Sequence, residues 1–427
     1  MWLRLAATAA FALARCDIAL AQVHSVITLD DAFARVADKH PDLRWVDTRR
    51  DVLAADLAGA LLPPVSTAGV TLENAFGSGA THGVRAAELS LTLASVFERG
   101  GKLDARRTLA QSRIDALAIE RETRRLDLLA EVARRYLAIV AARDQQRIAE
   151  LDVAQRERAV AAAETRLRAG ASPESVLLTA RAAHARAQLD RDRGALRVDA
   201  ARRHLASLWG DGDAQFDVAA IDPTVLPAIA DAGMLAVLLE QAPELAKFAD
   251  ERRIREARLQ LARSDGSADL QWQVGVRRLE AGDDTALLAS LSIPLGTRQR
   301  TQPARRAAEA ELASLDIERE GRDLALHSTL IDAHGRYRAA QIEVDRLCDE
   351  VLPLLARAET AAEHAYRSGA SSYLEWAQVQ SARIAELRQQ LDVAVDAQRA
   401  LIEIQRLTGQ PMLPAARTSA DAAENRR

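Results

Sequence analysis

The chain contains 427 residues, and its 57 lysines and arginines nearly balance its 61 aspartates and glutamates, leaving a formal net charge of -4. A nucleic-acid-binding protein normally carries a clear basic excess, so this balance argues against that class. Aromatic residues make up only 4% of the chain, with 20 glycines and 12 prolines, a composition typical of long helices. The two cysteines, Cys16 and Cys348, are too few and too separated for a disulfide framework, a cysteine zinc site or an iron-sulfur cluster.

The N-terminus has the organisation of a secretory signal peptide. Arg4 precedes an apolar run over residues 5–14, and Ala19-Leu20-Ala21 then supplies a small-residue cleavage pattern. We therefore expect residues 1–21 to be removed on export, with a buried helix start as the alternative. Lipidation of Cys16 is a second possibility, although Arg15 stands where a lipoprotein signal has a small residue. No other stretch of 18 apolar residues occurs, so the mature chain is predicted to lack a membrane-spanning helix.

Long helices dominate the first half. Residues 103–169 contain neither glycine nor proline, and apolar residues recur there at spacings of three and four. One uninterrupted helix of that length would span roughly 100 Å. Gly170 is placed to end it in the left-handed conformation. Ser172 as N-cap and Pro173 as first residue then predict a return helix over 173–209.

The second half repeats this order, with a long helix predicted over 303–368 and a return helix over 372–408. Gly369 follows Gly170 by 199 residues, and Gly409 follows Gly210 by the same 199. Agreement of two landmarks at one offset predicts an internal duplication. The predicted division is a first repeat over 22–211, a linker over 212–231, a second repeat over 232–411 and a disordered tail over 412–427.

Just before each long helix the apolar period changes from 3.6 to 2, which predicts β-hairpins over about 66–96 and 268–296. In the first hairpin Leu89, Leu91 and Leu93 alternate with polar residues. Strands of about 10 residues can cross a bilayer when tilted. Four such strands cannot close a barrel alone, and open edges in lipid are costly, so three copies supplying twelve strands are expected. The alternative is a small soluble sheet packed on the helices.

This order of elements, repeated behind a signal peptide, resembles the TolC-like outer-membrane factor family over residues 28–411. Three short motifs resemble its CzcC-type branch, which serves heavy-metal efflux pumps: Leu72-Glu73-Asn74-Ala75-Phe76-Gly77-Ser78-Gly79, Val96-Phe97-Glu98-Arg99-Gly100-Gly101-Lys102 with Arg106, and Leu291-Ser292-Ile293-Pro294-Leu295.

The resemblance implies a mainly α fold with a small β part. Three copies would form a twelve-stranded barrel in outer-membrane lipid and an α-helical tunnel in the periplasm. Such a homotrimer is a passive conduit that receives substrate from an inner-membrane pump, here of RND type, through a periplasmic adaptor protein. The branch implies divalent heavy-metal cations as substrate. Drug efflux and type I protein secretion remain alternatives within the family.

The resemblance also implies functional positions at the helical tips. Tyr366 matches the family's tip tyrosine, and Glu375 matches a pore-constricting aspartate at the tunnel entrance. The next family aspartate corresponds to Gln378, so any acidic ring would be weaker. The residues expected to dock the adaptor are Arg168, Gly170, Ala171, Ser172, Arg367, Gly369, Ala370 and Ser371.

The sequence contains no recognisable catalytic or cofactor-binding motif. Gly100-Gly101-Lys102 lacks the earlier glycine of a phosphate-binding loop, because Val96 occupies that position. The eight histidines are scattered, without the convergence that a metal site needs. We therefore expect no enzyme activity, no cofactor and no resident metal. A soluble exported coiled-coil scaffold is the alternative from another class, but it leaves the two hairpins unexplained.

Overall fold

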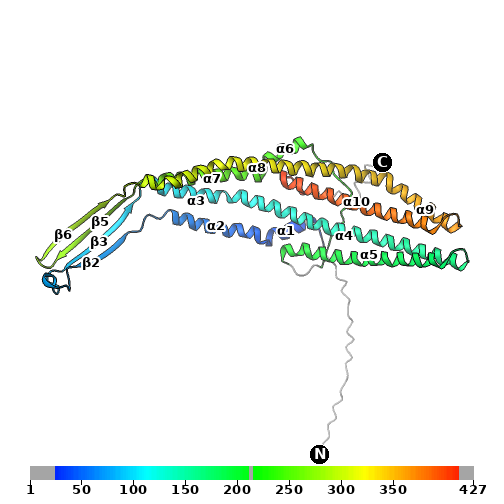
Figure 1. Cartoon of the computed structure of the whole chain (residues 1–427), viewed down its shortest axis with the longest axis horizontal. Helices are drawn as coiled ribbons and strands as arrows, with labels where there is room; N and C mark the ends of the chain where they lie inside the picture. The colour runs from blue at the N-terminus through cyan, green and yellow to red at the C-terminus, as the bar shows by residue number, and fades with distance from the viewer. Residues whose placement is uncertain (1–24, 211–214, 413–427) are drawn as a thin grey trace, which may run out of the picture.

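The computed structural model describes residues 25–210 and 215–412, and Figure 1 shows them as one elongated molecule. The strands lie at one end, and the turns of two long helical hairpins lie at the other. The predicted signal peptide, Cys16 and the tail beyond residue 412 fall outside the described residues. Within these ranges no helix is long and apolar enough to cross a membrane.

Each half of the chain contributes short helices, two strands, a long helical path and a return helix. The first half contains β1 (Ser25–Ile27), α1 (Leu29–Lys39), α2 (Pro41–Ala60), β2 (Thr67–Glu73), a 3-10 turn (Gly79–Thr81), β3 (Glu88–Phe97), α3 (Lys102–Asp115), α4 (Leu117–Arg168), α5 (Glu174–Ala206) and a second 3-10 turn (Ser207–Trp209). After β4 (Phe216–Val218), the second half contains α6 (Ala232–Glu240), α7 (Pro243–Ser264), β5 (Leu270–Leu279), β6 (Asp284–Ser292), α8 (Thr297–Arg346), a π-helical turn (Leu347–Val351), α9 (Leu352–Ser368) and α10 (Tyr373–Thr408).

The long helices form a layer one helix thick. In the half nearer the strands, α2 contacts α3, α3 contacts α7, and α7 contacts α8 (Figure 1). In the half nearer the tips, α5 contacts α4, α4 contacts α10, and α10 contacts α9. The seam between the repeats therefore lies at α3–α7 and α4–α10. The outer edges are α2 and α5 on one side and α8 and α9 on the other.

The four long strands form one antiparallel sheet in the order β2-β3-β5-β6. The two hairpins join where β3 pairs with β5, and Leu91 lies opposite both Val70 and Val276. Because paired residues share a face, one face carries the leucines and valines. The other face carries Ser90, Arg277 and Gln273. The predicted alternation and the four strands are confirmed, and β2 and β6 remain as the edges of the sheet.

Two buried tyrosines anchor the segments that cross the layer. The Tyr136 hydroxyl on α4 donates to the Ile27 carbonyl at 3.1 Å, and the Tyr337 hydroxyl on α8 donates to the Pro227 carbonyl at 2.5 Å. Burial raises the pKa of each tyrosine to about 12. Each tyrosine lies in one of the two largest hydrophobic clusters.

The long helical paths differ from the predicted ones. The first is α3 followed by α4, with a single turn residue, Ala116, whose backbone is still right-handed helical. The second begins at Thr297 rather than Pro303, and the π-helical turn interrupts it just before Pro353. A proline lacks the N–H that continues an α-helical ladder, and a π-turn accommodates that loss. The predicted linker over 212–231 also contains a strand, β4, which pairs in parallel with β1.

Candidate functional site

The first helical tip joins α4 to α5. Gly170 has φ +70°, and its N–H donates to the Leu167 carbonyl at 2.9 Å. The predicted left-handed glycine is confirmed. Ser172 does not cap α5, since Pro173 occupies the N-cap position in an extended conformation and the helix starts at Glu174. The prediction of a serine cap here was wrong because the fixed φ of proline suits the extended N-cap as well as the first helical turn.

The second tip joins α9 to α10 and is better capped. Gly369 has φ +85°, which confirms the second left-handed glycine. The capping residue is Ser372. The Ser372 hydroxyl accepts from the Glu375 N–H at 3.3 Å, and the Glu375 carboxylate accepts from the Ser372 N–H at 3.0 Å. This reciprocal capping box fixes the Glu375 side chain at the start of α10.

The two tips pack on each other through an aromatic cluster. The Tyr366 ring lies 6.0 Å from the Tyr373 ring and 5.4 Å from the Trp376 ring, and its side chain is only 2% exposed. From the other tip, the Arg166 guanidinium lies 4.8 Å from the Tyr366 ring centre and donates to the Tyr366 carbonyl at 2.5 Å. Arg166 therefore links the two hairpins, and no sequence motif had pointed to it.

The predicted tip residues have different environments. Tyr366 is buried in the single chain, so it forms part of the tip core. Glu375 and Gln378 are exposed, one helical turn apart on α10. The pore-entrance assignment of all three remains a prediction. The predicted adaptor-docking residues are mostly exposed: Arg168, Gly170, Ala171, Arg367, Gly369 and Ala370 are exposed, whereas Ser172 and Ser371 are partly buried.

Above the tips, the seam buries a polar network. Glu359 on α9 is 3% exposed and accepts from the Gln155 amide at 3.0 Å and the Arg383 guanidinium at 2.5 Å. Beside it, Arg156 donates to Asp152 at 3.0 Å within α4. Buried charges need such partners, because an unpaired one is strongly destabilising. The network therefore fixes α4 against α9 and α10, and the apolar periodicity of the sequence did not indicate it.

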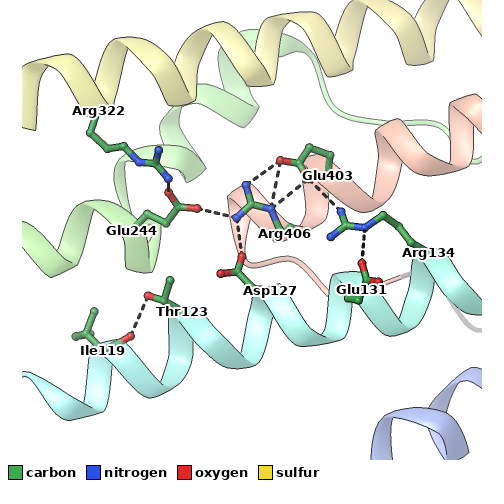
Figure 2. Close-up of polar contacts among 9 residues, drawn as sticks. All are labelled: Ile119, Thr123, Asp127, Glu131, Arg134, Glu244, Arg322, Glu403 and Arg406. Atoms are coloured by element: carbon green, nitrogen blue, oxygen red, sulfur yellow. Dashed lines mark hydrogen bonds and ion pairs between the residues drawn. The ribbon is translucent and has the colours of Figure 1, made fainter. Parts of the chain in front are cut away.

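A second set of ion pairs joins both repeats nearer the strands (Figure 2). Arg406 on α10 donates to Asp127 on α4 at 2.9 Å and to Glu244 on α7 at 2.7 Å. Glu244 also pairs with Arg322 on α8, and Arg406 with Glu403. Four helices therefore meet at one level of the layer.

The electrostatics of this junction favour its charged form. Burial alone would lower the pKa of the Arg406 guanidinium, but the hydrogen bonds to Glu403 and Glu244 raise it above the usual value. For Glu244, burial would raise the pKa, yet hydrogen bonds from Arg406 and Arg322 hold it below its ordinary 4.5. In the part of the chain that the structure describes, no three histidine, cysteine or acidic side chains converge as metal ligands.

The outer membrane efflux protein family model matches residues 35–211 of the chain. The cobalt-zinc-cadmium resistance protein CzcC of Cupriavidus metallidurans is 25% identical over 279 residues, which cover 65% of this chain and 67% of CzcC.

Solved structures show the same fold at low sequence identity. A membrane protein from Pseudomonas aeruginosa superimposes with a TM-score of 0.75 at 20% identity, covering 96% of both chains. CusC gives 0.75 at 18% identity over 90% of this chain and 92% of its own. VceC from Vibrio cholerae gives 0.73 at 16% identity over 90% and 97%. The predicted TolC-like fold is thereby confirmed.

Proposed function

We propose that the chain is a member of the outer membrane efflux protein family, whose model matches residues 35–211, and that it is the outer-membrane channel of a tripartite efflux system. Three copies would enclose one passage that crosses the outer membrane and continues through the periplasm. The helical tips would meet a periplasmic adaptor, and an inner-membrane pump of RND type would supply the energy.

The observation that carries this proposal is the incompleteness of the single chain. The sheet ends at β2 on one side and β6 on the other, and an open strand edge in lipid costs several kcal/mol per unsatisfied group. The helical layer ends on the same two sides. Three copies placed head to tail would pair every β2 with a neighbouring β6, giving twelve strands and closing both layers together.

The two faces of the sheet suit a barrel in lipid. Leu91, Val274 and Val276 share the apolar face, which would contact lipid. On the polar face Arg277 donates to Glu88 at 2.7 Å and to Glu73 at 3.0 Å. A charged cluster spanning three strands is tolerated on a water-filled lumen and is costly in lipid. The polar face is therefore proposed to line the passage.

The proposed cargo is divalent cobalt, zinc or cadmium, by similarity to CzcC. A conduit must release what enters it, so transport requires no tight metal site on this chain. Deletion of the gene in its native host should lower tolerance to these three cations and leave tolerance to hydrophobic dyes unchanged. Loss of dye tolerance with normal metal tolerance would instead assign the channel to drug efflux.

A further inference from the structure

The apolar face of the sheet ends on its helix side with aromatic side chains. The last pair of β3 and β5 is Phe97 with Leu270, and Trp272 lies two residues further along β5 on the same face. Phe97 is 63% exposed, and β3 is a central strand, away from the sheet edges that would join the copies. Aromatic side chains of membrane barrels gather where the hydrocarbon meets water. Phe97 and Trp272 therefore mark the level at which the proposed barrel leaves the lipid on its periplasmic side.

Three strand-to-helix corners lie together at this level (Figure 1). Residues 98–101 join β3 to α3, residues 265–269 join α7 to β5, and residues 293–296 join β6 to α8. Two glycines let these corners approach one another. A Cβ on Gly100 would collide with the Ser267 side chain, and the Arg298 Cγ lies 4.0 Å from the position that a Cβ on Gly266 would take. The three corners therefore form one continuous surface, with the stem of Arg298 lying against the middle corner.

The carboxylates of this surface are engaged within the chain. Asp269 accepts from the Lys102 ammonium at 2.7 Å and from the Arg99 backbone N–H at 3.1 Å. Glu98 accepts two hydrogen bonds from the Arg106 guanidinium, each at 2.6 Å. These bonds neutralise the two carboxylates closest to the turn between β3 and α3, so the remaining basic side chains of the corners lack those partners.

The corners consequently carry an excess of positive charge. Residues 97–107, 263–269 and 293–306 contain nine lysines and arginines against four aspartates and glutamates, in a chain whose net charge is -4. Five of these arginines are exposed, and within the described residues their guanidinium groups form no hydrogen bond or ion pair: Arg99, Arg107, Arg298, Arg300 and Arg306. Arg99 follows Phe97 by two residues, the spacing at which strand side chains return to the same face. Unpaired positive charge therefore lies directly beside the last apolar side chains of the sheet.

This combination fits the headgroup region of a membrane. Guanidinium groups bind phosphate oxygens through parallel hydrogen bonds, and basic side chains next to a membrane-embedded segment are attracted to anionic lipids. A soluble acidic partner would account for the arginines, but it would leave the exposed aromatic ring of Phe97 on the same surface without an apolar contact. A phospholipid supplies both a phosphate and acyl chains.

We propose that the three corners bind the phosphate groups of anionic phospholipids in the periplasmic leaflet of the outer membrane. Arg99 and Arg298 contact the headgroup, while Phe97 and Trp272 contact the acyl chains. This inference rests on the proposed membrane-spanning channel and identifies the class of lipid that surrounds it. The surface occurs once per chain, so three such lipid sites encircle the trimer.

Native mass spectrometry of the detergent-solubilised mature protein measures lipid binding and chain number in one spectrum. The protein should bind dioleoylphosphatidylglycerol more tightly than dioleoylphosphatidylcholine. Each arginine beside an anionic lipid surface contributes about fivefold, so Arg99→Gln with Arg298→Gln should lower this preference roughly 25-fold. Arg99→Lys with Arg298→Lys keeps both charges and should retain most of the preference.

The matched control is Arg121→Gln with Arg319→Gln. Both arginines are exposed, neither forms an ion pair within the described residues, and each lies about 30 Å along the helices from its counterpart at the corners. The control removes the same charge from the chain and should bind both lipids as the unmodified protein does. Phe97→Ala tests the apolar half of the surface and should weaken the binding of both lipids by a similar factor.

Two outcomes would overturn the lipid inference and leave the channel intact. One is a trimer that binds the two lipids equally, and the other is an equal loss of preference in the corner and control variants. Displacement of phosphatidylglycerol by inorganic phosphate would also contradict it, by assigning the arginines to free phosphate. Monomers that keep the lipid preference would refute the trimeric channel alone.

Discussion

The seam between the two repeats and the outer edges of the same layer have opposite chemistry. At the seam, Glu359 and Arg156 are buried in a polar network. At the edges, Ile317 and Leu324 are exposed on α8, as Trp45 is on α2. A complete soluble layer would place these groups the other way round, with charges outside and isoleucines inside. The inversion indicates that the seam is an interface completed within the chain, whereas the exposed apolar edges fit the proposed contact with another copy of the chain.

The same contrast separates equivalent positions of the two long helical paths. Tyr337 and Tyr136 play matching roles at an offset of 201, and this offset aligns Ile331 of α8 with Ala130 of α4. Ala130 is 0% exposed in the hydrophobic cluster that it shares with Tyr136, whereas Ile331 is 64% exposed. The duplication thus conserves the helical path, while the position within the layer decides which residues are buried.

The largest expected effect comes from breaking the seam network. Arg383→Met removes the shortest hydrogen bond to Glu359 and leaves a buried carboxylate poorly compensated. We expect about 3–5 kcal/mol of destabilisation, measured as a lower temperature of helix melting by circular dichroism. Arg336→Met, which breaks an exposed pair with Asp332, should cost no more than about 0.5 kcal/mol. Similar losses in both variants would mean that the seam is no more critical than the surface.

The effect of an arginine substitution in the sheet on membrane insertion should depend on which face of the sheet carries it. Leu91→Arg places a charge on the apolar face and should impair membrane insertion by about 2–4 kcal/mol near the bilayer midplane. Gln273→Arg, on the polar face of β5, should insert nearly normally. Membrane fractionation and heat-modified gel mobility measure insertion. Equal insertion defects in the two variants would mean that the apolar face is wrongly assigned to lipid.

Packing substitutions compare the core with an edge directly. Ala130→Leu adds volume where α4 is fully enclosed and should destabilise the folded chain by about 1–3 kcal/mol. Ile331→Ala removes volume from an exposed position, so the unfolding of a detergent-dissociated monomer should change by less than about 0.5 kcal/mol. Chemical denaturation of each monomer supplies both values. A large loss for Ile331→Ala would show that α8 is already covered within the chain.

The two tips should respond alike to loss of their glycines. Gly170→Val and Gly369→Val each place a side chain at positive φ, at a cost of about 1–2 kcal/mol. We expect barrel assembly to persist and export to fail, because the exposed turn proposed to meet the adaptor is distorted. Adaptor cross-linking and metal tolerance are the two readouts. Normal docking by both variants would refute the tip assignment.

The smallest effect concerns pH at the ion-pair junction. The pKa of Glu244 is lowered in the folded chain, so its stabilisation is complete above the ordinary value of 4.5 and is lost as the pH falls through the folded value. Glu244→Gln should remove about 1 kcal/mol at pH 7 and flatten the acid side of the stability profile. Melting temperatures between pH 3 and 7 test this expectation, which an unchanged acid slope would contradict.

Local periodicity was sufficient to predict the helices, the hairpins and both left-handed glycines, because each depends on neighbours along the chain. The pairing of β3 with β5 and the link from Arg166 to Tyr366 were not predictable, since they join residues about 180 to 200 positions apart. The N-cap of α5 was misplaced by one position for a local reason. A serine beside a proline offers two alternatives that only the geometry of the turn decides.

The central claim is that three chains close one passage. Native mass spectrometry of the mature protein, released from detergent micelles, measures the number of chains without labels or substitutions. The account predicts a dominant species of three chains, each without its signal peptide. Monomers or dimers as the dominant species, in protein that retains its helical content, would contradict it.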